Sequence, residues 1–341
     1  MAPATSSTSF QQIQVHTLST DFRHATKIIE VPEVPSPSAN HVVVKNAYVG
    51  INATDINITN GAYGARPLPF SCGLEGVGTV VSIGEGVSNV QVGDYVAYQK
   101  LGAFAEYVEV AAATVIKSPE LSPSVVPLTV CGISASIALE QVGELRSKET
   151  VLVTAAAGGT GQFVVQLAKQ AGNHVIGTCS SDEKVEYLKS LGCDRVINYK
   201  REDVSSVLKK EYPDGVNLVF ETVGGEMFRA AAENLAVHGR IIVFGYISGY
   251  KASDREKQTQ MVVSELAPRL LSKSASVRGF LLGNHAAHIP AHMKKLLGLV
   301  AEKKLSAGVD STDFVGLSGV ADALDHMYAG KNIGKVVVRL S

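Results

Sequence analysis

Residues 151–169 constrain the fold of this chain more than any other segment. The apolar run at 151–154 is typical of a buried strand, and the amphipathic pattern at 162–169 is typical of a helix. Small residues join the two in an A-x-x-G-x-x-G spacing that begins at Ala155. Such a turn lets a pyrophosphate approach the backbone, and the start of the helix offers unpaired N–H groups to its charge. The residues predicted at the phosphates are Ala157, Gly158, Gly159, Thr160 and Gly161.

The rhythm of the predicted elements changes along the chain. Up to about Lys117, short alternating strands are separated by Gly, Asn and Asp turns, which favours a strand-rich, partly closed barrel. From about Val151, strands alternate with helical patterns, which favours a doubly wound parallel sheet with helices on both faces. The predicted domains of this α/β chain are a barrel at 1–126, a Rossmann domain at 127–283 and a returning part of the barrel at 284–341.

Composition argues against several classes of protein. The 341 residues are 45% hydrophobic and 18% charged, as in a compact globular chain, and the formal net charge of −1 gives no field that would attract nucleic acid. We expect no apolar run of membrane-spanning length, because charges interrupt every long candidate. The four cysteines form no C-x-x-C pair and are predicted to be reduced thiols. These features favour a cytoplasmic protein without nucleic-acid or membrane partners.

The end of the second Rossmann strand decides which dinucleotide is bound. A carboxylate there accepts from the adenosine ribose, but it would repel the 2′-phosphate of NADPH. Here the strand at 174–178 runs into small hydroxyl residues, so that Ser180 can donate to a phosphate and Lys184 can supply charge. Asp182 is expected to be the N-cap of the next helix. We therefore predict NADPH, with Tyr199 either covering the adenosine phosphate or simply partly buried.

Two more loops follow strand ends, at 221–225 and 245–248. Ligands bind at the carboxyl edge of such sheets, so both loops are expected to border the nicotinamide. The residues predicted there are Val223, Gly245, Tyr246, Ile247 and Ser248. Phe280 and Leu282 are expected to wall the nicotinamide and to leave space for an apolar acceptor.

Several motifs carry a resemblance to a known family. The segments GINATDIN (50–57), GAY (61–63) and GLEGVG (73–78), with 270–281 and 327–335, resemble the zinc-free medium-chain dehydrogenase/reductases of the quinone oxidoreductase, or zeta-crystallin-like, group. The resemblance implies a GroES-like barrel as the catalytic domain, a Rossmann domain and a homodimer.

The resemblance also implies roles for single residues. A tyrosine that matches Tyr250 lies beside the nicotinamide in the reductases that this chain resembles. Asn332 and Lys335 match a returning segment near the cofactor, with Lys335 as a solvated strand-end charge being the alternative. The homodimer would form through the strand at 276–280.

Zinc is not expected. Zinc-dependent relatives carry a ligand cysteine where Asn52 stands and a ligand histidine where Leu74 stands, and neither replacement suits Zn²⁺. Glu75 remains, but one carboxylate does not hold a catalytic zinc. The three histidines of 285–292 surround Pro290, which is expected to begin a helix, and we interpret them as solvated surface.

The resemblance implies hydride transfer from NADPH to a small apolar quinone or α,β-unsaturated ketone, such as a 15-keto prostaglandin, and the expected absence of zinc agrees with this. A conjugated acceptor spreads its developing charge, so neutral hydrogen-bond donors suffice without a metal. Asn52 is a candidate for holding the cofactor ribose or the acceptor oxygen, with a turn or cap role as the alternative. Tyr63 and Tyr250 are candidate donors to the substrate oxygen or the ribose.

Two other functions stay open at this point. One is an enoyl-thioester reductase, which would need a basic rim for its carrier. The other is an NADPH-binding module for redox sensing or RNA binding, with little turnover. Neither a basic rim nor a basic and aromatic stretch is visible in the sequence.

Overall fold

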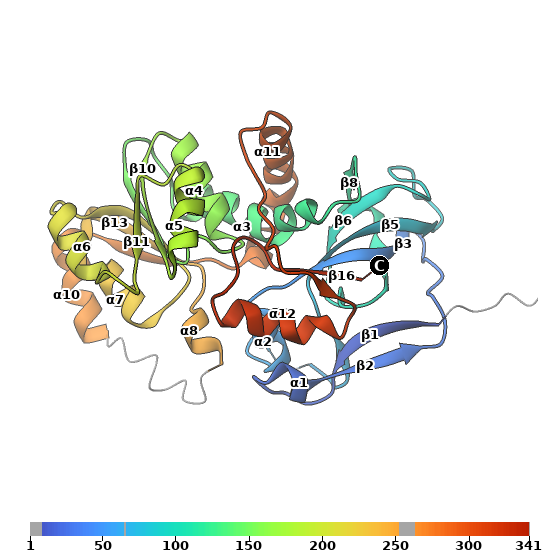
Figure 1. Ribbon diagram of the computed structural model, residues 1–341. Helices are drawn as coiled ribbons and strands as arrows, with labels where there is room; N and C mark the ends of the chain where they lie inside the picture. Colours follow the sequence, from blue (N-terminus) through green and yellow to red (C-terminus); the bar gives the residue numbers. More distant parts are fainter. Residues whose placement is uncertain (1–8, 65, 252–262, 341) are drawn as a thin grey trace, which may run out of the picture. The chain divides into compact units, whose positions relative to one another are not determined.

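The computed structural model describes residues 9–64, 66–251 and 263–340, and its contacts divide the chain into two compact units (Figure 1). Unit 1 comprises Met1–Val130, Val309–Lys331 and Lys335–Ser341. Unit 2 comprises Cys131–Gly308 and Asn332–Gly334.

These units differ from the predicted domain ranges mainly at their second boundary. Unit 2 continues to Gly308 because helix α11 (Ile289–Ala301) packs against α3 (Ile133–Ile137) inside that unit. The three residues from Asn332 also belong to unit 2, where the Gly334 N–H donates to the Ala157 carbonyl at 2.8 Å. The first boundary follows Val130, close to the predicted residue 126.

Unit 1 is built from strands. In the described part of the chain, a seven-stranded sheet follows the order β15-β16-β3-β5-β6-β8, with β7 on β3, and a three-stranded sheet follows β2-β1-β4. Short helices and one longer helix complete the unit. These elements are β1 (Phe10–Val15), α1 (Phe22–Ala25), β2 (Thr26–Val31), β3 (His41–Gly50), α2 (Asp55–Thr59), β4 (Phe70–Ser71), β5 (Glu75–Ile83), β6 (Tyr95–Gln99), β7 (Tyr107–Ala111), β8 (Ile116–Ser118), β15 (Phe314–Val315), α12 (Gly319–Tyr328) and β16 (Val337–Arg339).

Strand β3 shows why this sequence folds as a strand-rich core. Val42 and Val44 join one apolar cluster of unit 1, whereas Val49, near the strand's end, joins a second. Val320 and Leu324 of α12 complete the second cluster. The predicted return of the last strand is confirmed, since β16 pairs antiparallel with β3 although the two are far apart in the sequence (Figure 1).

Unit 2 contains a parallel sheet of six strands in the order β11-β10-β9-β12-β13-β14 among the residues described. The doubly wound sheet predicted from the alternating pattern is therefore confirmed. Its strands are β9 (Thr150–Val153), β10 (His174–Cys179), β11 (Arg195–Asn198), β12 (Val216–Glu221), β13 (Leu235–Val243) and β14 (Ser276–Gly279).

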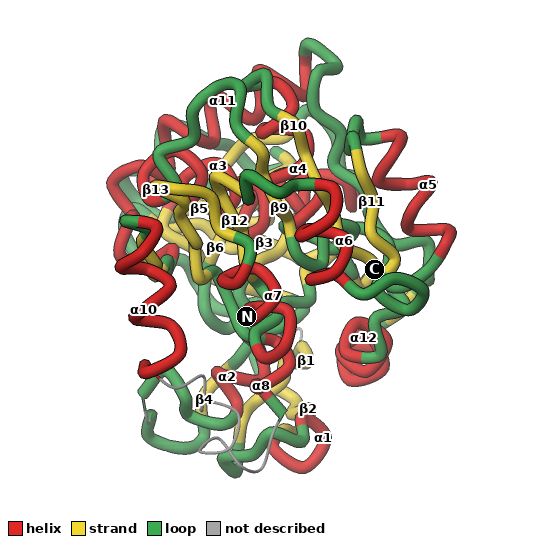
Figure 2. Tube along the Cα trace, turned by 90° about the vertical axis from the view of Figure 1, so that its left-hand side faces the viewer, coloured by secondary structure: helices red, strands yellow, loops and turns green. Residues whose placement is uncertain are grey.

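Helices surround this sheet (Figure 2). One apolar cluster joins strand residues such as Leu152 and Ile241 to Leu208, Ala231 and Leu270 on three helices. The helices of unit 2, besides α3 and α11, are α4 (Gly161–Gln170), α5 (Asp182–Ser190), α6 (Val204–Glu211), α7 (Gly225–Glu233), α8 (Ile247–Tyr250) and α10 (Val263–Lys273).

One expectation about apolar segments is wrong. The continuous helical stretch Pro123–Val142 is long and apolar enough to span a membrane by length and composition. However, 78% of its most apolar window is buried inside the protein, as in the core helix of a folded domain.

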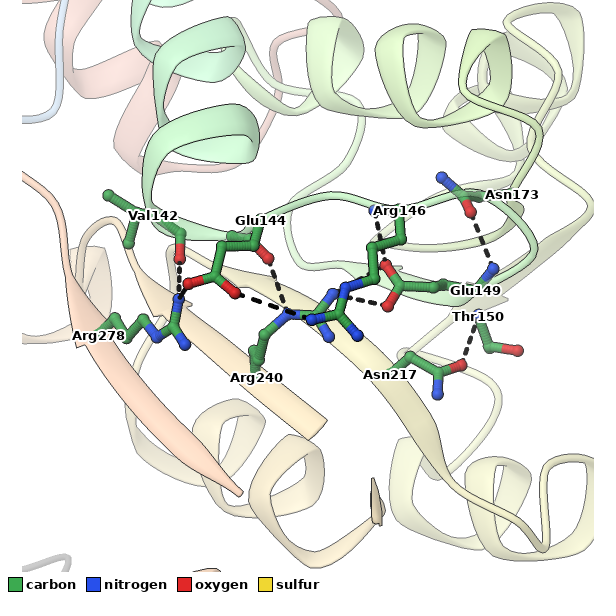
Figure 3. A network of polar contacts seen from close by, with 10 residues as sticks. Val142, Glu144, Arg146, Glu149, Thr150, Asn173, Asn217, Arg240 and Arg278 are labelled. Atoms are coloured by element: carbon green, nitrogen blue, oxygen red, sulfur yellow. Dashed lines mark hydrogen bonds and ion pairs between the residues drawn. The ribbon is translucent and has the colours of Figure 1, made fainter. Parts of the chain in front are cut away.

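A buried ion pair joins the start of β9 to β13 in unit 2. Arg240 Nη2 lies 2.7 Å from Glu149 Oε1, and the two side chains are 7% and 10% exposed (Figure 3). Arg240 Nε also donates to the Gly143 carbonyl at 2.7 Å. The Glu149 carboxylate accepts from the Arg146 N–H, and the Glu149 N–H donates to Asn173 (Figure 3). This network ties the segment before β9 to the sheet that carries the glycine-rich loop.

Candidate active site

The glycine-rich loop lies between the end of β9 and the start of α4. A Cβ added to Gly161 would lie 2.6 Å from the carbonyl oxygens of Ala155 and Ala156, so this position requires glycine. Thr160 is the N-cap of α4, and its side chain makes no capping hydrogen bond. Among the described residues, no side chain therefore occupies the start of α4, and the loop fits a dinucleotide phosphate.

The returning residues of unit 2 lie against this loop. Gly334 forms a bridge with Gly158 and donates its N–H to the carbonyl of Ala157, both in the loop. Asn332 is 8% exposed, and its Nδ2 donates to the Gly334 carbonyl at 2.9 Å. The structure therefore brings Asn332 together with the predicted phosphate-binding residues.

The loop after β10 corrects one expectation. Ser181, not Asp182, is the N-cap of α5, because the Ser181 hydroxyl accepts from the Lys184 N–H. Asp182 is the first helical residue, and its carboxylate accepts from Arg201 Nη2 and from Asn198 Nδ2. The residues predicted for the adenosine phosphate come shortly before and after Asp182 or follow the next strand, β11. Ser180 is half-buried, Lys184 is 8% exposed and Tyr199 is exposed.

Arg201 is a residue that sequence reasoning missed. It follows β11 and is ion-paired with Asp182, so its guanidinium group compensates that carboxylate beside the residues predicted for the adenosine phosphate. A second basic residue, Lys200, lies over the Tyr199 ring. The run Tyr-Lys-Arg directly after a strand was the signal that could have found these charges.

The loop after β12 is held by a buried carboxylate. Glu221 accepts from the N–H groups of Val223 at 2.9 Å and Gly224 at 3.1 Å, and burial raises the pKa of Glu221. The Ser248 hydroxyl donates to the Val223 carbonyl at 2.6 Å. The two loops predicted to border the nicotinamide are therefore joined to each other.

Tyr250 lies beneath the second of these loops. It is 7% exposed, and its hydroxyl accepts from the Tyr246 N–H at 3.3 Å. A Cβ on Gly245 would lie 2.8 Å from the Tyr250 hydroxyl oxygen, so the glycine allows this approach. Ile247 begins α8 directly after Tyr246, which is 45% exposed.

Phe280 and Leu282 follow β14 and are half-buried. The Phe280 ring stacks on Phe244, with centroids 5.4 Å apart, and on His285 at 5.1 Å. Phe280 of the predicted apolar wall is thus part of an aromatic stack in unit 2.

The histidines of 285–292 correct another interpretation. His292 is 5% exposed and its Nδ1 lies 2.8 Å from the Ser136 hydroxyl, so it is a core residue and not solvated surface. Burial lowers the pKa of His292. Pro290 lies in the first turn of α11, as predicted.

Tyr63 lies in unit 1 and is 51% exposed. Its hydroxyl oxygen accepts from Thr54 Oγ1 at 2.8 Å and from Asn57 Nδ2 at 3.3 Å. Two donors directed at the phenol oxygen leave its own proton for a further acceptor. This geometry suits the predicted role as a donor.

Asn52, also in unit 1, belongs to a buried polar cluster that follows β3. Lys335 Nζ lies 2.6 Å from Glu75 Oε1 and 2.7 Å from Asn52 Oδ1, and Asn52 Nδ2 donates to Glu75 Oε1 at 2.9 Å. Lys335 is 2% exposed, so its interpretation as a solvated strand-end charge is wrong. We name this cluster of Asn52, Glu75 and Lys335 the amide–ammonium triad.

Asp55 is a further buried ionisable residue beside the triad. Its Oδ2 accepts from the Asn52 N–H at 2.8 Å, whereas its Oδ1 has no hydrogen-bond partner among the described residues. Burial raises the pKa of Asp55 from 3.8 to about 7.

The triad does not fit zinc. The oxygens of Asn52 and Glu75 that could face a metal are both bound to the Lys335 ammonium, and Leu74 supplies no donor. Within 9–64, 66–251 and 263–340, no group of three or more His, Cys, Asp or Glu side chains is placed to hold a metal. The positive charge in contact with Asn52 and Glu75 is the ammonium of Lys335.

Two family models match this chain, one within unit 2 and one within unit 1. Residues 159–302 match the family model of zinc-binding dehydrogenases, and residues 38–120 match the GroES-like domain of alcohol dehydrogenases. Prostaglandin reductase-3 of Mus musculus is 47% identical, with 97% of this chain and 90% of the relative covered. A probable quinone oxidoreductase of Leishmania amazonensis is 45% identical, with 98% and 99% covered. The quinone oxidoreductase of Escherichia coli, solved in complex with NADPH, has a TM-score of 0.84 at 25% identity, with 96% of this chain and 99% of that chain covered.

Proposed function

Because the chain belongs to the quinone oxidoreductase group of the medium-chain dehydrogenase/reductases, we propose that it is an NADPH-dependent reductase of quinones and α,β-unsaturated ketones. The observation that carries this proposal is the glycine-rich loop at an uncapped helix start, in a parallel sheet of Rossmann order. The relatives named above are reductases, and one of them was solved with NADPH.

The residues of unit 2 fit the parts of this cofactor in turn. The loop 157–161 and Asn332 hold the pyrophosphate, and Ser180, Lys184 and Arg201 supply donors and charge to the 2′-phosphate. The joined loops at Val223 and 245–248 border the nicotinamide. When bound, the cofactor supplies the hydride.

The chemistry of the acceptor follows from the groups available. Reduction of a conjugated ketone adds hydride to the β-carbon and a proton to the α-carbon of its C=C bond, and the charge that develops between the two steps is spread over the α-carbon and the oxygen. Neutral donors such as the Tyr63 hydroxyl are sufficient for that charge, and most of the acceleration would come from holding the two reactants face to face. An ammonium in place of a metal at Asn52 supports a zinc-independent reaction.

We also propose a cytoplasmic homodimer without nucleic-acid or membrane partners. Strand β14 forms the edge of the parallel sheet, and its open side can pair with a second copy of the chain. Cys72, Cys131, Cys179 and Cys193 are free thiols, which persist in a reducing compartment. The net charge of −1 supports the absence of nucleic-acid binding. The burial of the stretch 123–142 supports the absence of a membrane partner.

Initial rates of NADPH oxidation test the function. We expect steady turnover with phenanthrenequinone and with simple enones, and none with isolated ketones. Tight NADPH binding without turnover of any acceptor would favour the binding-module alternative. A strong preference for coenzyme A thioesters would favour the enoyl-thioester reductase.

Lys184→Ala tests how the cofactor is recognised. A charge-assisted hydrogen bond to phosphate contributes about 1.5–3 kcal/mol, so we expect NADPH affinity to fall by about 10- to 100-fold with little change for NADH. Fluorescence titration with both nucleotides measures the two constants. Lys189→Ala, at an exposed position of the same helix, is the control. Equal small losses for both nucleotides would contradict the assignment.

A further inference from the structure

Lys335 is a buried cation for which the proposed reaction has no role. It is among the largest fully buried side chains, yet it ends in a charge that contacts Glu75 and Asn52. A buried ion pair commonly returns no more free energy than the loss of water costs. The pair between Lys335 and Glu75 is therefore better explained by the groups that it holds in position than by a gain in stability.

The triad fixes the orientation of the Asn52 carboxamide. Its Oδ1 faces the Lys335 ammonium, which can only donate, and its Nδ2 faces the Glu75 carboxylate, which can only accept when ionised. Rotating the amide by half a turn would place NH2 against NH3⁺ and C=O against COO⁻. Glu75 is itself held, because its Oε2 accepts from the Thr129 hydroxyl and from the Val130 N–H at 2.9 Å.

This orientation decides what Asn52 can still bind. Both N–H bonds of its amide have acceptors inside unit 1, Glu75 Oε1 at 2.9 Å and the Gly50 carbonyl at 3.4 Å. Its Oδ1 has two lone pairs, and Lys335 uses one in the contacts described. The remaining capacity of the side chain is that of an acceptor, which suits a hydroxyl and not a carbonyl oxygen.

We propose that Lys335 is a positioning residue that, with Glu75, locks the Asn52 amide so that its Oδ1 accepts a hydrogen bond from a hydroxyl of the nicotinamide ribose. The proposal rests on the function proposed above and chooses between the two roles open for Asn52. The ammonium acts through the amide and does not itself touch the reacting atoms.

A double-mutant cycle, measured with NADPH and with altered cofactors, tests this proposal. The protein variants are Asn52→Ala, Lys335→Met and their combination, and the ligands are NADPH and two analogues that each lack one hydroxyl of the nicotinamide ribose. Lys331→Met, at an exposed position in the preceding turn, is the matched control. Glu75→Gln keeps the shape of the side chain without its charge, and it replaces Lys335→Met if that variant does not fold.

We expect each single variant to weaken NADPH binding about 10-fold and the double variant to be no weaker than the worse single one. One of the two analogues should bind the wild type about 10-fold more weakly than NADPH, and this difference should vanish in Asn52→Ala, Lys335→Met and Glu75→Gln. A residue that only stabilises the fold would leave this discrimination between ligands unchanged.

The proposal would be overturned if the losses of NADPH affinity in the two single variants multiplied in the double variant. It would also be overturned if Lys335→Met kept the full difference in affinity between NADPH and the analogue, or if the wild type did not distinguish the analogues from NADPH. In these cases the wild type still binds and oxidises NADPH, and the proposed function stands. A wild type that binds no NADPH would contradict both.

Discussion

Replacing Arg240 by methionine should lower the free energy of unfolding by about 3–5 kcal/mol, because a buried carboxylate would lose its partner. Glu149 would keep the Arg146 N–H at 3.0 Å as a donor, but its charge would stay uncompensated at 10% exposure. Urea unfolding of the variant and the wild type measures the difference.

Arg278→Met is the matched control, since Arg278 belongs to the same network but its pair with Glu144 is far more exposed, at 35% and 51% of the two side chains (Figure 3). Solvent screens such a pair, so we expect a far smaller loss. The double variant Arg240→Met with Glu149→Leu should recover part of the loss by removing both charges. A loss for Arg240→Met as small as that for Arg278→Met would contradict this account.

Asp55→Asn should change how stability depends on pH. The folded-state pKa of Asp55 is raised by burial to about 7 from 3.8, so the folded protein binds a proton there that the unfolded chain releases. This contribution is fully present below pH 3.8 and is lost as the pH rises through about 7. The whole shift corresponds to about 4 kcal/mol.

The measurement is the free energy of unfolding of both proteins at pH 5 and pH 8. Between these values the wild type should lose about 2–3 kcal/mol relative to Asp55→Asn, because the other titrating groups cancel in the difference. The asparagine keeps an acceptor for the Asn52 N–H. Parallel pH dependences of the two proteins would show that Asp55 is ionised in the folded state at pH 5.

The architecture could be predicted because its signals are local. The inner strands β9 and β12 are largely apolar runs, and Gly161 is fixed by a contact with residues only five or six positions away. The N-cap of α5 was missed by one residue because Ser181 and Asp182 are both good caps and only the backbone conformation separates them.

The amide–ammonium triad could not be predicted from local pattern. Lys335 precedes an apolar strand, where a lysine is usually solvated, and its partners lie more than 250 residues earlier. One signal was present, since Glu75 stands in a segment of Gly, Leu and Val, and a carboxylate buried there needs a cation. His292 is a similar case, because its hydrogen-bond partner Ser136, in α3, lies 156 residues earlier.

Transfer of label from NADPH carrying deuterium at both hydrogen positions of nicotinamide C4 tests the central claim most directly. With an acyclic α,β-unsaturated ketone as acceptor, we expect a saturated ketone with deuterium at the β-carbon and a solvent proton at the α-carbon. Proton and deuterium NMR of the product locate the label. Deuterium on the carbonyl carbon of an allylic alcohol, or no label in any product, would contradict the account.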